Sequence, residues 1–135
     1  MSLVLDNSVA LAWCFEDEQT DAVMALLDRV VAEGAVAPQL WPIEALNGLL
    51  SAQRRGRIDA AGRRQLVDLL SQLPVELDDE MGLRAWTATE TLAEQHGLTA
   101  YDAAYLELAA RRRLPLATRD DALIRAAVDA GIDLV

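Results

Sequence analysis

Four acidic residues occupy positions that favour a shared site over simple solvation. Asp6 directly follows the first predicted strand, and Asp120 comes two residues after the fourth. Glu44 and Asp102 each lie in the first turn of a predicted helix. Each acid alone could cap a helix or complement its dipole. In a parallel α/β sheet, however, Asp6 and Asp120 follow strands at the carboxyl edge, where ligands bind, and the helix starts that carry Glu44 and Asp102 can face the same edge. We therefore expect the four carboxylates to converge.

Converged carboxylates repel one another, and a hard divalent cation removes that cost. Mg²⁺ prefers oxygen ligands and keeps several waters, so few carboxylates suffice to hold it. Such an ion lowers the pKa of bound water and neutralises charge on a phosphodiester. The chain has a single histidine, His96, and a single cysteine, Cys14. The pattern predicts hydrolysis of phosphodiesters without a histidine, serine or cysteine nucleophile.

Composition indicates one ordinary domain over residues 1–135. Hydrophobic residues make up 53% of the chain, which is enough for a core, and the single cysteine excludes an internal disulfide. No apolar run reaches the roughly 18 residues of a membrane span, and no signal peptide is visible, so a soluble cytoplasmic protein with no membrane contact is expected. The net charge is −10, and all 12 cations are arginines, whose planar forks suit phosphate.

Short apolar runs alternate with stretches of helical periodicity. The expected strands and helices alternate in a β-α order that favours a three-layer α/β/α domain with a five-stranded, mostly parallel sheet. The strands are expected at 3–5, 35–37, 75–77, 116–118 and 132–135, and the helices at 9–15, 20–33, 42–55, 59–73, 81–95, 99–113 and 121–130.

Four motifs, spread over nearly the whole chain, resemble those of PIN domains in the family's order. Each is weak alone, and together they are specific. They are LDNSV at 5–9, PQLWPIEALN at 38–47, LTAYDAAYLELA at 98–109 and LATRDDAL at 116–123. The resemblance implies a five-stranded parallel sheet and an endoribonuclease that depends on Mg²⁺ or Mn²⁺.

The same resemblance assigns roles to individual residues. Asp6, Glu44, Asp102 and Asp120 match the family's acidic quartet. In the mechanism this suggests, one or two ions are held by Asp6, Asp102 and Asp120, and Glu44 orients or deprotonates the attacking water. Asp121, next to Asp120, is an alternative for the fourth position. The supporting polar positions are matched by Ser8, Asn47 and Thr118.

The chain's small size resembles that of VapC toxins among PIN proteins. This implies an RNA substrate, a homodimer and a cognate VapB-like antitoxin. Arg119 is a candidate RNA contact. Tyr105, one helical turn after Asp102, either stacks on bases or packs in the core.

Two other classes remain open at this stage. One is an inactive PIN-like module that only binds partners. The other is a Mg²⁺-dependent phosphoryl-transfer domain, which normally needs a lysine near the phosphate, and this chain has none.

Overall fold

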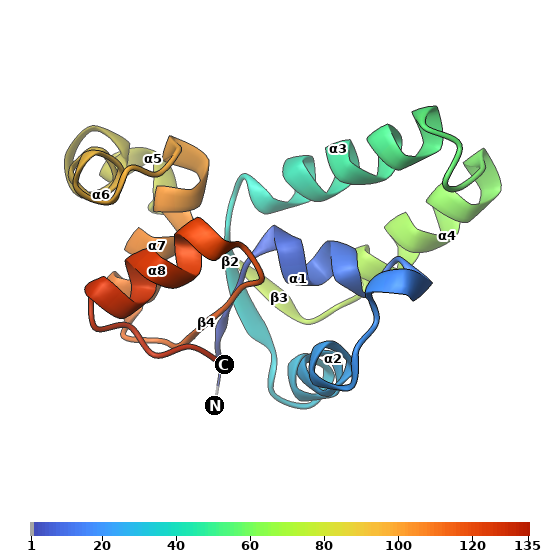
Figure 1. Ribbon diagram of the computed structural model, residues 1–135, viewed down its shortest axis with the longest axis horizontal. Helices are drawn as coiled ribbons and strands as arrows, with labels where there is room; N and C mark the ends of the chain where they lie inside the picture. Colours follow the sequence, from blue (N-terminus) through green and yellow to red (C-terminus); the bar gives the residue numbers. More distant parts are fainter. Residues whose placement is uncertain (1) are drawn as a thin grey trace.

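The computed structural model describes residues 2–135, and its centre is a parallel sheet (Figure 1). The order of the strands is β3-β2-β1-β4, and every pairing between neighbours is parallel. Their bounds are β1 (Val4–Leu5), β2 (Ala35–Pro38), β3 (Val75–Asp78) and β4 (Leu116–Ala117).

Helices connect the strands and cover both faces of the sheet. After β1 come α1 (Asn7–Ala12), the short 3-10 turn η1 (Glu16–Glu18) and α2 (Asp21–Glu33). The pair α3 (Trp41–Arg54) and α4 (Ala60–Ser71) links β2 to β3. Between β3 and β4 lie α5 (Met81–Arg84), η2 (Ala85–Thr89), α6 (Glu90–His96) and α7 (Ala100–Arg112), and α8 (Asp121–Asp129) follows β4.

Alternation along the strands divides the core into two layers. Leu3 and Leu5 pack with α1, α2, α3 and α4, whereas Val4 and Val36 pack with α7 and α8. Successive strand residues face opposite sides of a sheet, which is why one strand supplies both cores. In Figure 1, α1 to α4 lie to one side of the strands and α7 and α8 to the other. The α/β/α layering therefore agrees with the expectation from sequence.

The expectation of five strands is wrong, because the described sheet has four. The segment 132–135 pairs with β4 only through an isolated bridge between Leu116 and Leu134. The backbone N–H of Ile132 donates to the carbonyl of Ala127 at 2.9 Å, which closes the end of α8. This helix ending takes up the first residue of the expected strand, so no ladder develops.

The expected helix at 81–95 is also interrupted. The segment η2 has π-helical hydrogen bonding, and its Trp86 side chain is 85% exposed. None of the helices within residues 2–135 is both long enough and apolar enough to cross a membrane.

The chain reverses its direction of travel across the sheet between β1 and β4. From β1 it proceeds to β2 and β3, and it then returns to pair β4 on the other side of β1. Side chains just beyond the carboxyl ends of β1 and β4 therefore meet at a topological switch point. Asp6 lies there, with its backbone N–H donating to the carbonyl of Ala117 at 3.0 Å.

Candidate functional site

Asp6 is a buried carboxylate at the end of β1, with 4% of its surface exposed. Its backbone is extended, and its side chain caps α1 by accepting a hydrogen bond from the Ser8 N–H at 3.3 Å. Aspartate is favoured at this position because it satisfies an N–H that the helix leaves unpaired. The strand-to-helix turn thus fixes the carboxylate at the sheet edge.

Two hydroxyls hold the same carboxylate oxygen of Asp6. The hydroxyl of Ser8 donates to Asp6 Oδ2 at 2.5 Å, and that of Thr118 donates to it at 2.9 Å. Thr118 Oγ1 in turn accepts the backbone N–H of Asp120 at 3.1 Å. Hydrogen bonds from second-sphere groups orient carboxylates that bind ions. The network connects the ends of β1 and β4 through side chains.

Asp120 and Asp102 both lie at helix N-termini that face this edge. Asp120 Oδ2 accepts the Leu123 N–H at 2.9 Å and thereby caps α8. Thr99 caps α7 by accepting the Asp102 N–H at 3.1 Å, and the Asp102 carboxylate also interacts with the Thr99 side chain. The sequence expectation that Thr99 begins this helix is confirmed.

Glu44 reaches the site from the first turn of α3. Its Oε1 accepts a hydrogen bond of 2.7 Å from the phenol of Tyr105, whose side chain is 0% exposed. The phenol belongs to α7, so the bond joins the two core layers at the sheet edge. Burial, followed by the bond to Glu44, raises the pKa of Tyr105, so its hydroxyl stays a donor.

The charges of the four acids act on one another. Burial is the main cause that raises the pKa of Asp6, and the charge of Asp120 adds to it. Burial likewise raises the pKa of Asp102, with further contributions from Asp120 and Asp6. Glu44 has a raised pKa because of burial, and Asp6 and Asp102 add to it. These couplings link Asp6 to Asp120, Asp102 and Glu44 at this edge of the sheet, and the convergence of all four acids on one ion stays a prediction.

This donor set fits a divalent cation. It consists of carboxylates that repel one another, and a bound cation offsets that repulsion. Within residues 2–135, the closest group of three potential ligands lies elsewhere, at Asp78, Asp79 and Glu80, whose ligand atoms lie within 4.8 Å of one another. Arg111 already pairs with two of those acids, to Asp78 Oδ2 at 2.7 Å and to Glu80 Oε2 at 3.1 Å. An arginine therefore occupies that cluster, and the set around Asp6 is the better candidate.

The remaining predicted residues differ in their contacts. Asn47 is exposed on α3, and no side-chain hydrogen bond is found for it among residues 2–135, so its supporting role stays a prediction. Asp121 is exposed in the first turn of α8, whereas the charge of Asp120 reaches Asp6 and Asp102. Of these two neighbours, Asp120 fits the site. Arg119 is exposed at the rim, and its N–H donates to Ser8 Oγ at 2.9 Å.

Stacking of Tyr105 on an RNA base does not fit its burial. Its ring lies in the core beside α8 and β1, with no free face, and only its hydroxyl enters the site. The sequence analysis missed the bond to Glu44. The spacing of three residues between Asp102 and Tyr105 was the available signal, because it places both on one helix face.

Comparisons with known proteins agree with this geometry. The PIN domain family model matches residues 3–129. A comparison with curated protein sequences finds no match.

Solved structures of similar fold cover most of the chain. A Pyrobaculum aerophilum protein, PAE2754, is 28% identical, with a TM-score of 0.69 over 93% of this chain and 84% of that one. FitAcB from Neisseria gonorrhoeae is 21% identical, with a TM-score of 0.68 over 99% of this chain and 96% of that one. VapBC2 from Rickettsia felis, bound to a DNA fragment from their promoter, is 13% identical, with a TM-score of 0.68 over 100% of this chain and 98% of that one. With the family model matched over nearly its whole length, this chain belongs to the PIN domain family.

Proposed function

We propose that the protein is a metal-dependent endoribonuclease and acts as the toxin of a toxin–antitoxin pair. The observation that carries the nuclease proposal is the gathering of Asp6, Glu44, Asp102 and Asp120 at the carboxyl edge of the sheet, where burial and neighbouring acidic charges raise the pKa values of Asp6, Glu44 and Asp102. Without a cation, the repulsion between these carboxylates destabilises the fold. Around a divalent cation, the same carboxylates serve as ligands.

In the proposed mechanism, Asp6, Asp102 and Asp120 would hold Mg²⁺ or Mn²⁺, directly or through water. A bound ion of this kind neutralises charge on the scissile phosphodiester and lowers the pKa of a nearby water. Glu44 orients that water and accepts its proton, which fits a carboxylate whose pKa is raised. Tyr105 fixes one oxygen of Glu44, so the other oxygen is left for the water. Ser8 and Thr118 fix Asp6 in the same way.

The attack forms a bond between the water oxygen and phosphorus and breaks the bond between phosphorus and the 3′ oxygen. The 3′ oxygen takes a proton from solvent water and leaves as a 3′-hydroxyl, and the phosphate stays on the 5′ end of the other product. The scheme does not use the RNA 2′-hydroxyl as the nucleophile. Products that end in 2′,3′-cyclic phosphate would contradict it.

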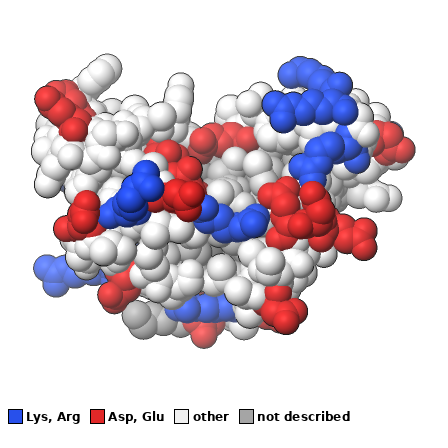
Figure 2. Space-filling model, viewed as in Figure 1, with Lys and Arg blue, Asp and Glu red and all other residues white. Residues whose placement is uncertain are grey.

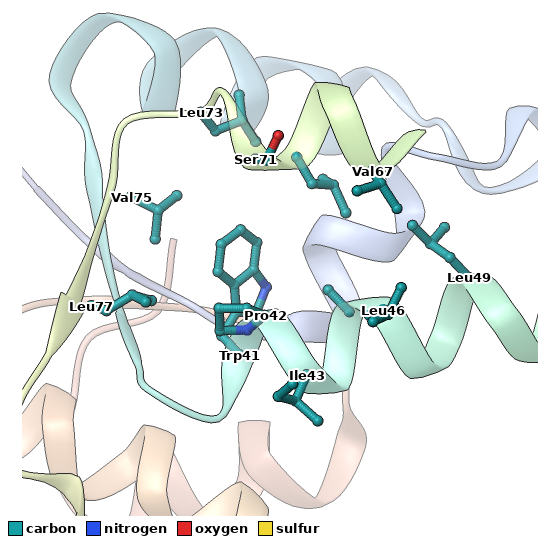
Figure 3. Close-up of a pocket in the computed structure, with 12 residues that line it drawn as sticks. Trp41, Pro42, Ile43, Leu46, Leu49, Val67, Ser71, Leu73, Val75 and Leu77 are labelled. Carbon is teal, nitrogen blue, oxygen red and sulfur yellow. The ribbon is translucent and has the colours of Figure 1, made fainter. Parts of the chain in front are cut away.

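An apolar groove supports the proposed antitoxin partner. It lies between α3, α4 and β3, has a volume of about 430 Å³, and includes Ile43, Leu46 and Leu77 among its exposed lining residues (Figure 3). Exposed apolar surface of this kind marks interaction sites in soluble proteins. Ile43 directly precedes Glu44, so a bound antitoxin segment would lie beside the acids.

A second exposed apolar area supports the proposed homodimer. Leu83 and Trp86 are largely exposed, and Trp86 and Tyr101 line a hollow of about 650 Å³. In a dimer through this face, Trp86→Asp is expected to give a monomer, measured by light scattering coupled to size exclusion. A Trp86→Asp variant with the wild-type mass, or a monomeric wild type, would contradict this interface.

The decisive experiment combines metal binding with RNA cleavage. Mn²⁺ is titrated calorimetrically into antitoxin-free protein and into Asp6→Asn, and a mixed RNA pool is incubated with and without EDTA. We expect binding to wild type only, and cleavage that EDTA stops and added Mn²⁺ restores. A folded protein that neither binds Mn²⁺ nor cleaves RNA would instead be an inactive interaction module.

A further inference from the structure

Two arginines meet one carboxylate at the rim of the acid site. Arg57, in the turn between α3 and α4, directs Nη1 to Glu18 Oε2 at 3.4 Å. Arg119, in the turn between β4 and α8, directs Nη1 to Glu18 Oε1 at 3.3 Å. The carboxylate of Glu18 therefore lies between two guanidinium groups and presents one oxygen to each.

The position of Arg57 is set by more than this ion pair. Its guanidinium stacks over the ring of Phe15 at 4.1 Å from the centroid, and its Nη2 pairs with Asp17 at 2.8 Å. The backbone holds it too, since Gly56 adopts a left-handed φ of 78° and the Arg57 N–H donates to the carbonyl of Ala52 at 2.9 Å. Stacking on an aromatic ring preorganises a guanidinium for a bidentate ligand.

The second arginine is tied to the acid site itself. The backbone N–H of Arg119 donates to Ser8 Oγ, and that hydroxyl donates to Asp6. Figure 2 shows basic surface on both sides of an acidic patch on the face that carries these loops. The pair of arginines thus lies next to the carboxylates, on a chain whose net charge of −10 otherwise repels nucleic acid.

We propose that Arg57 and Arg119 form a binding subsite for a phosphodiester of the RNA strand, and that Glu18 occupies this subsite until RNA displaces it. A phosphodiester, like a carboxylate, shares one negative charge between two oxygens, and arginine forks suit both. The subsite deepens the nuclease proposal, on which it rests, by naming where the backbone next to the scissile bond is held.

Exchange of Glu18 for RNA is energetically accessible. The side chains of Arg57, Arg119 and Glu18 are each more than a third exposed, at 40%, 38% and 34%. Ion pairs this exposed stabilise a protein only weakly, so little is lost when Glu18 swings away. After the exchange both arginines are paired with the phosphodiester in place of Glu18, and Arg57 keeps its pair with Asp17.

The test is RNA binding under conditions that prevent cleavage. A fluorescent single-stranded RNA of about 12 nucleotides, long enough to track a binding groove, is titrated in EDTA, and binding is followed by anisotropy over a range of salt concentrations. Arg57→Gln and Arg119→Gln are each expected to weaken binding about tenfold. Each should also reduce the slope of log Kd against log salt by about 0.7. Glu18→Gln is expected to tighten binding by up to about fivefold.

The matched controls use an ion pair at the opposite edge of the sheet. Arg29→Gln and Glu33→Gln make the same charge changes near the end of α2, where the chain enters β2. Both should change affinity far less than their counterparts at the rim. The gain from Glu18→Gln should disappear in a chain that also carries Arg57→Gln and Arg119→Gln, because no subsite remains to be unmasked. Arg57→Lys, which keeps the charge, should recover only part of the affinity.

Three results would overturn the proposal: no RNA binding at low salt, equal effects at the rim and at the control pair, or a Glu18→Gln gain that survives loss of both arginines. Failure of the nuclease proposal looks different. In that case RNA is not cleaved with Mn²⁺ present, yet the arginine-dependent binding in EDTA persists.

Discussion

The bond between Tyr105 and Glu44 allows a sharp test of how the site is organised. Tyr105→Phe removes only the hydroxyl and keeps the ring that fills the core, so it opens no large cavity. A hydrogen bond to a charged group contributes about 1.5–3 kcal/mol. Glu44 is only half-buried, so we expect the lower end of that range. For a chain of this size, a loss of about 1.5 kcal/mol corresponds to a fall in Tm of about 5 °C.

Cleavage should fall as well, because Glu44 loses the contact that fixes its free oxygen toward the water. A loss of about 1.4 kcal/mol of transition-state stabilisation lowers kcat about tenfold. KM should stay near the wild-type value, since Tyr105 is buried and does not touch RNA. The assay is cleavage of a labelled RNA at saturating Mn²⁺, together with thermal melting in EDTA.

Tyr101→Phe is the matched control. It makes the same chemical change one helical turn earlier on α7, at a side chain that is 65% exposed. Tyr101 also lines the proposed dimer face, but Tyr101→Phe keeps its ring there, so Tm and kcat should both stay close to the wild-type values. In the Glu44→Gln background, Tyr105→Phe should cost less than it does alone, because a neutral amide is a weaker acceptor than a carboxylate. Equal Tm and kcat for the variants at 105 and 101 would refute the reasoning.

Three further predictions concern charge. Asp6→Asn removes a carboxylate of the proposed metal site, so it should abolish cleavage. It keeps the cap of α1 and removes one of several mutually repelling charges, so Tm measured in EDTA should rise. A variant that still cleaves RNA would show that Asp6 is not part of the site. Because the pKa values of Asp6, Glu44 and Asp102 are raised, the metal-free fold binds more protons than the unfolded chain does. The stability of the metal-free fold should therefore fall as pH rises from the ordinary carboxyl range toward neutrality. Saturating Mg²⁺ should remove this dependence of Tm on pH. A metal-free Tm that rises over the same pH range would contradict the assignment of these three acids to one site. Arg111→Met should destabilise the fold by about 3 kcal/mol, because it removes the shortest ion pairs of the buried carboxylates Asp78 on β3 and Glu107 on α7. The adjacent Arg112→Met loses a more exposed pair with Glu76 and a longer contact of 3.9 Å with Asp78, and it should cost less than about 1 kcal/mol in denaturant unfolding.

The sequence predicted the parts of the fold that depend on local patterns. Apolar runs and helical periodicity located the four strands of the sheet and nearly all helices, and the position of Asp6 after a buried strand located the site. The fifth strand failed because pairing depends on how α8 ends, which periodicity does not reveal. The break at η2 has no proline or glycine signal within 85–89.

Contacts between side chains far apart in the sequence were the second feature that the sequence could not predict. The bond from Tyr105 to Glu44 joins residues 61 apart, and the pairing of Arg111 with Asp78 joins residues 33 apart. A single sequence shows that such residues are present, and only the packing of the helices on the sheet shows which of them meet. For the same reason the sequence did not reveal that Glu18 lies between two arginines, because η1 and two separate turns bring these residues together.

The helix caps at this edge bear on which positions would report a loss of catalysis in chains related to this one. Asp6 and Asp120 each cap the N-terminus of a helix, so folding alone would preserve an aspartate there after catalysis had been lost. The carboxylates of Glu44 and Asp102 cap no helix, and burial beside like charges makes both costly to keep. In a comparison of related chains, the presence of an acid at positions 44 and 102 is therefore the better indicator that catalysis has been maintained. For the same reason, alanine at position 6 or 120 would confound lost activity with lost stability, whereas asparagine separates the two.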